Sequence, residues 1–157
     1  MSGTPATVAL RAAGIAFTEH PYAHDPGVES FGHEAAAALG VEPGRVYKTL
    51  VVELDRRLVI GVVPVTGRLD LKALAVAVGG KKASMADPAT AERRTGYLVG
   101  GISPIGQKTS HPTVVDGSVT RWTTVFVSGG RRGFDVELTP ADLLMVTGAI
   151  VAAIATP

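Results

Sequence analysis

The sequence of 157 residues contains no cysteine. This absence excludes disulfide bonds, thiolate metal sites and a cysteine nucleophile supplied by the protein. A strong excess of one charge is missing as well, because 15 Lys and Arg stand against 14 Asp and Glu, for a net charge of +1. The overall charge therefore does not indicate a nucleic-acid-binding domain, and such a contact would need a local basic patch.

A long hydrophobic run is also absent. The longest apolar segment, residues 143–154, includes Thr147 and Gly148 and is too short to span a bilayer. Residues 1–5 do not form a basic region followed by an apolar stretch, so we expect no secretory signal. We expect a soluble, cytoplasmic protein that does not associate with a membrane.

The order of helix and strand signals predicts an α+β fold with a mixed sheet. A capping residue followed by proline predicts helices that begin after Thr4, Asp87 and Thr139. The other predicted elements are helices at 31–39 and 71–78, a hairpin of 47–54 and 58–65, and strands at 15–22, 97–99, 113–116, 123–127 and 134–138, with Ile150 in the last helix. The length fits one domain, residues 1–157.

Lys48 is the only charged residue in the run Val-Tyr-Lys-Thr-Leu-Val-Val, which is typical of a buried strand. A buried ammonium must find a partner or shift its pKa. Lys48 could be structural, reaching out from the strand end or pairing with a carboxylate. It could instead hold a phosphate or carboxylate of a ligand as a point charge. The residues alone leave both interpretations open.

Two glycine-rich turns adjoin predicted strands, at residues 100–106 and 128–133. Glycines permit close approach of the backbone, so the N–H groups near Gly100 could face an oxyanion or an ester carbonyl. The alternative is a tight bend in the first turn and a hairpin loop with solvated arginines in the second. Ser128 has no evident activating histidine and acid along the chain, and Asp135 could simply face water.

His20, Tyr22 and His24 are spaced by two residues, so one face of a strand could carry all three into a pocket. A metal site is the weaker hypothesis, because no further cluster of ligands accompanies them. Asp25-Pro26 is more typical of the start of a turn. We predict neither a metal nor a cofactor.

Several segments together resemble the YbaK/EbsC family, the free-standing relatives of the editing domain in bacterial prolyl-tRNA synthetases. The matching segments are His20-x-Tyr22-x-His24-Asp25-Pro26, Val46-Tyr47-Lys48-Thr49-Leu50, Leu69-Asp70-Leu71-Lys72, Met85-Ala86-Asp87-Pro88, residues 95–104 (Thr-Gly-Tyr-Leu-Val-Gly-Gly-Ile-Ser-Pro), and Val127-Ser128-Gly129-Gly130. The block that ends at Pro104 is the most specific of them. The resemblance implies a curved, partly barrel-like mixed sheet with helices packed around it.

Within that family the chain is most similar to the enzymes that remove cysteine from Cys-tRNA(Pro). The resemblance implies a mechanism without a protein nucleophile or cofactor. The substrate thiol attacks its own ester carbonyl, the 3′ hydroxyl of the tRNA is expelled, and a cyclic thiolactone forms. Lys48 would hold a phosphate of the terminal adenosine, amides near Gly100 would polarise the carbonyl, and Ser128 and Asp135 would position the aminoacyl group. The implied substrate-binding residues are Tyr22, His24, Gly101, Ser103 and Gly129.

The resemblance also implies the 3′ end of Cys-tRNA(Pro) as ligand and prolyl-tRNA synthetase as partner. One alternative is a deacylase for another mischarged tRNA such as Ala-tRNA(Pro), which would need an activated water. Another is a non-catalytic module that binds tRNA or a synthetase. The segment 107–111 carries one lysine, fewer than is usual in the family, so if it contacts tRNA the affinity would be lower or would depend on a partner. The basic pairs Lys81-Lys82, Arg93-Arg94 and Arg131-Arg132 could contact phosphates or simply form a solvated surface.

Overall fold

The computed structural model describes residues 3–25, 27 and 31–157. Its larger sheet has five strands in the order β5-β2-β3-β6-β9 and is mixed, because β2 pairs antiparallel with β5 and β3, while β6 pairs parallel with β3 and β9. The bounds are β2 (Tyr47–Leu54), β3 (Arg57–Pro64), β5 (Ala83–Met85), β6 (Thr113–Asp116) and β9 (Ile150–Ala152).

A second, antiparallel sheet has the order β1-β8-β7, with β1 (Thr18–Pro21), β7 (Val125–Arg131) and β8 (Phe134–Leu138). A parallel bridge between Val46 and Phe126 links it to the start of β2. Apolar side chains of both sheets, such as Ile60 and Val136, belong to one buried cluster. The predicted fold class is confirmed, and the join between the sheets places the ends of β2, β7 and β8 side by side.

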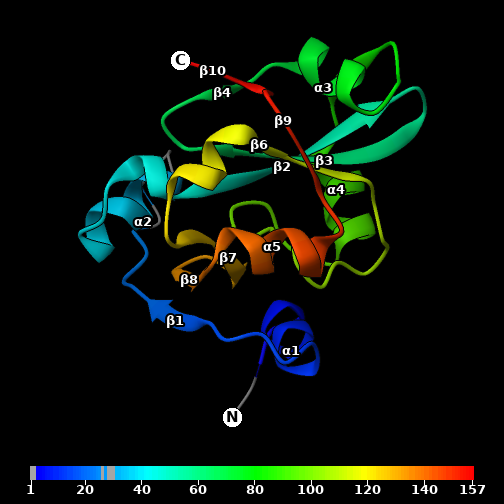
Figure 1. Cartoon of the computed structure of the whole chain (residues 1–157). Helices are drawn as coiled ribbons and strands as arrows, with labels where there is room; N and C mark the ends of the chain where they lie inside the picture. Colours follow the sequence, from blue (N-terminus) through cyan, green and yellow to red (C-terminus); the bar gives the residue numbers. More distant parts are fainter. Residues whose placement is uncertain (1–2, 26, 28–30) are drawn as a thin grey trace.

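Helices surround the two sheets, with α3 near the C-terminal strand and α1 at the opposite end (Figure 1). They are α1 (Pro5–Ala12), α2 (Phe31–Leu39), α3 (Leu71–Ala77), α4 (Pro88–Thr95) and α5 (Pro140–Thr147), with short 3₁₀ turns at Pro43–Arg45 and Gly117–Arg121. The side chains of Thr4, Asp70, Asp87 and Thr139 each accept a hydrogen bond from the first turn of the helix that follows. These four caps confirm the helix starts that the sequence predicts.

Two predicted elements are wrong. Residues 97–99 form no strand, because the Tyr97 ring is buried and its hydroxyl donates to Ile105 O at 2.6 Å, which folds the segment into a compact loop. Ile150 does not belong to the last helix, since Gly148 ends α5 in the left-handed conformation with φ 65° and Ile150 then pairs with Val114 in β9.

Smaller differences concern the strands. The predicted strands 15–22 and 123–127 are observed as β1 and β7, shortened in the first case and shifted toward the C-terminus in the second. The sequence did not predict β5, β9 or the two-stranded pair of β4 (Arg68–Leu69) with β10 (Ala155–Thr156). The predicted turn at Asp25-Pro26 lies partly outside the described residues.

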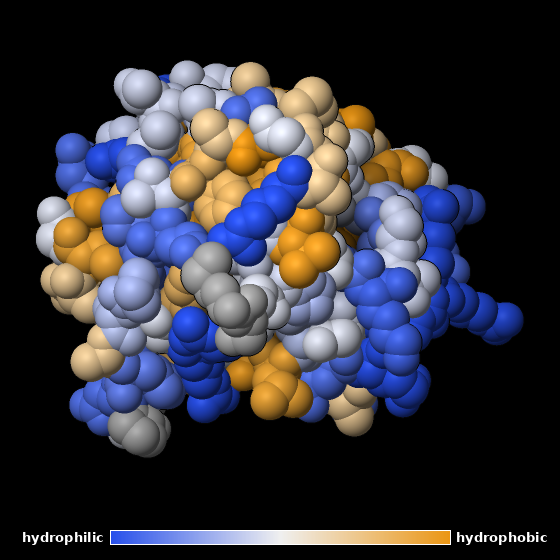
Figure 2. Space-filling view, turned by 90° about the horizontal axis from the view of Figure 1, so that it is seen from below, coloured by the Kyte–Doolittle hydropathy of each residue, from blue (hydrophilic) through white to orange (hydrophobic). Residues whose placement is uncertain are grey.

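No helix in the described part of the chain is long and apolar enough to cross a membrane. The face seen from the α1 end is hydrophilic over most of its edge, with separate apolar patches between the polar groups (Figure 2). Scattered apolar residues of this kind are normal on a protein surface. The features that suggest a function lie instead in a cavity between the sheets.

Candidate functional site

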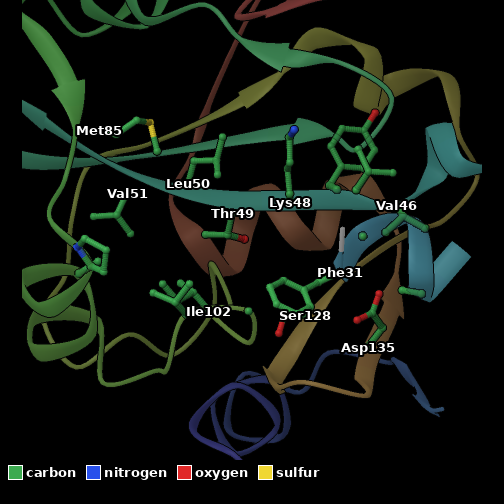
Figure 3. Close-up of a pocket in the computed structure, with 18 of the residues that line it drawn as sticks. Phe31, Val46, Lys48, Thr49, Leu50, Val51, Met85, Ile102, Ser128 and Asp135 are labelled. Atoms are coloured by element: carbon green, nitrogen blue, oxygen red, sulfur yellow. The ribbon is translucent and has the colours of Figure 1, made fainter. Parts of the chain in front are cut away.

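A cavity of about 460 Å³ lies where β2, α2, the loop after α4 and the β7–β8 pair meet. Tyr22, Lys48, Gly100, Ser128 and Asp135 all line it. The structure thus brings together five residues that are far apart in the sequence and that the sequence analysis had singled out. Most of the remaining lining is apolar and includes Phe31, Ala35, Val46, Val51, Val65, Met85 and Ile102 (Figure 3).

Ser128 and Asp135 form the polar corner of the cavity. They are direct partners across the antiparallel pair of β7 and β8, so their side chains emerge on the same face. Asp135 is only 5% exposed, and no hydrogen bond or ion pair from the described residues reaches its carboxylate. Burial raises the pKa of Asp135 to about 7.

Tyr22 adds a hydroxyl to the same region. Its backbone N–H donates to Gly133 O at 2.9 Å, which ties the end of β1 to the β7–β8 turn. Burial, with the negative charges of Asp135 and Glu34, raises the pKa of Tyr22 to about 12. The phenol therefore remains protonated at neutral pH and can donate a hydrogen bond.

Ser128 is not part of a catalytic triad in the described residues. Its hydroxyl accepts a hydrogen bond from Gly130 N–H at 3.1 Å within the bulge of β7. His20 lies opposite Asp135 in the sheet register, but its ring donates instead to Glu137 at 2.8 Å. Ser128 can position a ligand through hydrogen bonds, whereas no general base among the described residues is hydrogen-bonded to its hydroxyl to activate it as a nucleophile.

Lys48 lines the cavity from β2, but its side chain leaves this strand away from the polar corner. Figure 3 shows its side chain leaving β2 on the side opposite to Thr49, with Ser128 and Asp135 beyond Thr49. None of the ion pairs formed by the described residues includes Lys48. Burial, reinforced by the positive charge of Arg68, lowers the pKa of Lys48. Two cations near each other without a carboxylate favour an anionic ligand at this end.

Gly100 belongs to a loop whose backbone is held from both sides. Val99 N–H donates to Glu92 Oε2 at 2.8 Å, and Gly101 N–H donates to Leu98 O at 2.9 Å. Gly100 itself has φ 92°, a conformation that side-chain-bearing residues rarely adopt. The loop thus has a fixed shape, and Gly100 is the part of it that borders the cavity together with Val99 and Ile102.

Four predicted substrate-binding residues lie outside the cavity lining. His24 donates to Glu34 at 2.8 Å, and Ser103 is fully buried with its hydroxyl accepting from Ile105 N–H at 3.2 Å. Gly101 packs against the backbone of Arg131 and Arg132, and Gly129 packs against the Phe134 ring. Each of these residues supports a neighbour of the cavity rather than its inner surface.

The histidines do not form a metal site. His20 and His24 bind different carboxylates, Glu137 and Glu34, in separate parts of the structure. Within residues 3–25, 27 and 31–157, no group of three or more His, Asp or Glu side chains is placed to hold a metal ion.

Thr49 is a lining residue that the sequence analysis missed. Its hydroxyl is buried and has no hydrogen-bond partner in the described part of the chain. Alternation along β2 argues against it, because a residue next to Lys48 must face the other side of the strand. The apolar lining from α2 and α4 could not be found from this strand either, since it comes from other elements.

Known proteins resemble this chain in sequence and in fold. The family model described as the aminoacyl-tRNA editing domain matches residues 25–146. EbsC of Enterococcus faecalis, named "Putative Cys-tRNA(Pro)/Cys-tRNA(Cys) deacylase", is 41% identical over 122 residues, covering 77% of this chain and 74% of that protein.

Two solved structures share the fold over nearly the whole chain. A crystal structure described as "a putative trans-editing enzyme for prolyl tRNA synthetase" has a TM-score of 0.84 and 29% identity, and the match covers 98% of this chain and 96% of the other. Hypothetical protein APE2540 has a TM-score of 0.86 and 27% identity, with 97% and 99% covered. As the sequence resemblance predicted, the chain belongs to the aminoacyl-tRNA editing domain family.

Proposed function

We propose that the protein is a trans-editing deacylase that removes cysteine from mischarged Cys-tRNA(Pro). The observation that carries this proposal is that Lys48 and Asp135, two oppositely charged groups without protein partners among the described residues, line the same cavity, with their side chains on different faces of β2. The aminoacylated end of a tRNA carries the matching charges, a phosphate and an α-ammonium. Lys48 would hold the phosphate, and Asp135 would hold the ammonium.

The proposed chemistry needs no nucleophile from the protein. The substrate sulfur attacks the ester carbonyl carbon, the bond from that carbon to the ribose 3′ oxygen breaks, and this oxygen takes the proton that the thiol gives up. The product is a cysteine thiolactone, which water can then open. An intramolecular attack gains greatly from correct orientation, which Ser128, Tyr22 and the apolar walls would provide.

Backbone N–H groups near Gly100 would stabilise the negative charge that develops on the carbonyl oxygen. A donor with fixed geometry in a partly desolvated cavity needs little reorganisation at the moment of reaction. This role agrees with the position of Gly100 in the lining of the cavity that Lys48 and Asp135 also line.

Prolyl-tRNA synthetase is the proposed partner, since it would supply the mischarged tRNA. The relative named as a deacylase for cysteine esters and the structure described as a trans-editing enzyme for this synthetase both support the proposal. Because the proposed substrate is an aminoacyl-tRNA, we propose that the protein acts in the cytoplasm. The near-balanced net charge of +1 agrees with a protein that depends on a partner for tRNA affinity.

Deacylation of Cys-tRNA(Pro), Ser-tRNA(Pro) and Ala-tRNA(Pro) by the purified protein tests the proposal. We expect fast loss of cysteine with thiolactone as first product, and slow loss of serine and alanine, which lack the thiol. Equal rates for the three esters would contradict the thiol mechanism and favour an activated water. Absence of turnover together with tRNA binding would favour a non-catalytic module.

Lys48→Ala tests the phosphate contact in the same assay. Hydrogen bonds to charged groups contribute about 1.5–3 kcal/mol, so kcat/KM should fall by roughly 10- to 100-fold. Lys81→Ala is the matched control, because Lys81 is exposed and does not line the cavity. Normal turnover by Lys48→Ala would remove the central residue of the proposed site.

A further inference from the structure

Arg132, at the turn between β7 and β8, holds the peptide group that joins Val99 to Gly100. Its Nε–H and one of its Nη–H groups donate to Val99 O at 3.2 and 3.0 Å. Both hydrogen bonds reach the same acceptor, so the guanidinium fixes the direction of this carbonyl and not only its position.

Gly100 and Phe31 pack against the Arg132 guanidinium and help to keep it at the Val99 carbonyl. A Cβ atom on Gly100 would lie 2.3 Å from Arg132 Nε, so the guanidinium occupies the space that the glycine leaves free. On its other side the guanidinium carbon lies 4.5 Å from the centre of the Phe31 ring. Arg132 therefore connects α2, the Gly100 loop and the β7–β8 turn, three segments that enclose the cavity, and this packing orders an otherwise exposed side chain.

The planarity of the peptide group passes this restraint on to Gly100. In a trans peptide the C=O of one residue and the N–H of the next point in opposite directions. Because Val99 O faces Arg132, Gly100 N–H must point away from Arg132. Arg132 lines a separate hollow with Glu92 and Val99, whereas Gly100 lines the main cavity.

Gly100 N–H has no acceptor in the described part of the chain, although its neighbours in the loop are paired. An unpaired, fixed N–H on a cavity wall is the arrangement required of an oxyanion donor. Two charge-assisted hydrogen bonds to the carbonyl of the same peptide group also polarise it, which makes the N–H a stronger donor.

We propose that Arg132 is a positioning residue that aims Gly100 N–H at the ester carbonyl oxygen of the substrate. This inference rests on the proposed deacylase function. Arg132 acts through the Val99–Gly100 peptide and touches neither the phosphate nor the aminoacyl group, so its removal should slow the chemical step without weakening tRNA binding.

Single-turnover deacylation of Cys-tRNA(Pro) at several enzyme concentrations separates these two effects. Removing an oxyanion donor lowers kcat by about 10²–10³-fold. Arg132→Ala loosens the donor without deleting it, so we expect the maximal rate constant to fall by roughly 10- to 100-fold. The half-saturating concentration should stay close to the wild-type value. Arg132→Lys keeps a donor and should recover part of the rate.

Arg131→Ala is the matched control. Arg131 is the neighbouring exposed arginine, but its guanidinium stacks on Phe134 at 4.6 Å and makes no hydrogen bond to the Gly100 loop in the described residues. We expect this variant to keep the wild-type rate constant. An equal loss in both variants, an unchanged rate constant in Arg132→Ala, or a change confined to half-saturation would overturn the proposal.

The NMR signal of the Gly100 amide provides a readout that does not depend on activity. We expect it to move further in Arg132→Ala and Arg132→Lys than in Arg131→Ala, because only the first two change the hydrogen bonds to this peptide group. If the Gly100 amide signal of the two Arg132 variants stays at its wild-type position, the inference is overturned, even when the enzyme is active. A wild-type protein that releases no cysteine would instead contradict the proposed function. The Gly100 amide signal would still show whether Arg132 positions the Val99–Gly100 peptide group.

Discussion

Asp135 and Glu137 lie two residues apart on β8, so both side chains point to the same face of the strand. Their surroundings differ completely. His20 donates to Glu137 at 2.8 Å, Arg45 pairs with it at 3.3 Å, and the Thr124 hydroxyl donates to it. Asp135 is more deeply buried, yet none of the described residues forms a hydrogen bond or ion pair with its carboxylate.

The pKa values of the two carboxyl groups are shifted in opposite directions, because only Glu137 has hydrogen-bonding and charged partners among the described residues. Burial alone raises the pKa of Asp135 to about 7. Partial burial also acts to raise the pKa of Glu137, but hydrogen bonds from Thr124 and His20 and the charge of Arg45 hold it below its usual value. The same strand thus carries one carboxylate that the protein stabilises and one without a partner among the described residues, as the proposed ligand-binding role requires.

The comparison predicts very unequal effects of the two carboxylates on catalysis, and this is the largest expected difference. Asp135→Asn removes the charge that would hold the substrate ammonium, so kcat/KM for Cys-tRNA(Pro) should fall by about 100-fold. Glu137→Gln removes a charge outside the cavity lining and should change kcat/KM by less than about threefold. Steady-state deacylation kinetics of both variants check the prediction. Similar losses in the two variants would mean that β8 as a whole, and not Asp135, supports the reaction.

The next largest expected effect is the change that Asp135→Asn makes in the free energy of unfolding. A carboxyl group whose pKa is 3.8 in the unfolded chain and about 7 in the folded one binds protons more tightly when folded. The free energy of unfolding therefore falls as pH rises from about 4 to about 7. Each pKa unit corresponds to about 1.36 kcal/mol, so the ionised group destabilises the fold at pH 8 by up to about 4 kcal/mol.

Asp135→Asn removes this destabilisation, so the variant should be more stable than wild type at pH 8 by roughly 2 kcal/mol. At pH 4, where Asp135 is protonated, the two proteins should have similar stability. Urea unfolding at both pH values measures the difference. A variant that is less stable than wild type at pH 8 would show that Asp135 has a partner within the fold.

Local signals were sufficient for most of the fold. The caps at Thr4, Asp87 and Thr139 predicted helix starts correctly because a cap contacts only its own first turn. Residues 97–99 and Ile150 were assigned wrongly because their partners lie beyond the reach of a cap or turn signal: Ile105 is eight residues from Tyr97, and Val114 belongs to a distant strand. Contacts at such separations override a local preference.

The site could be predicted only as a set of separate residues. The lysine in an apolar run and the glycine pairs indicated Lys48, Gly100 and Ser128, and the family resemblance joined them with Asp135. The structure places His24 and Ser103 outside the cavity lining, where they form hydrogen bonds with Glu34 and Ile105. The sequence could not show this, because these hydrogen bonds become visible only in the fold. Whether a carboxylate has a partner depends on register between strands, which is why Asp135 and Glu137 looked alike before the structure was known.

The pH dependence of kcat/KM tests whether the ionised form of Asp135 is the form that supports the reaction. Only ionised Asp135 can hold the ammonium, so the ratio of kcat/KM between wild type and Asp135→Asn should fall about tenfold per pH unit below about 7, until it approaches one. Taking the ratio removes titrations that both proteins share, such as that of the substrate thiol. A ratio that stays constant between pH 5.5 and 8 would mean that the charge of Asp135 takes no part.

Glu137 should show the smallest effect, and with the opposite sign. Its folded pKa is lowered, so its ionised form stabilises the fold above the unfolded pKa, and this contribution is lost as pH falls through the folded pKa. Glu137→Gln should therefore lower the free energy of unfolding at pH 7 by about 1 kcal/mol, the usual net contribution of such a hydrogen bond, and by much less at pH 3. Urea unfolding of this variant beside Asp135→Asn gives two pH dependences with opposite slopes. Equal slopes would mean that hydrogen-bond partners do not decide which carboxylate on β8 is structural and which is left for a ligand.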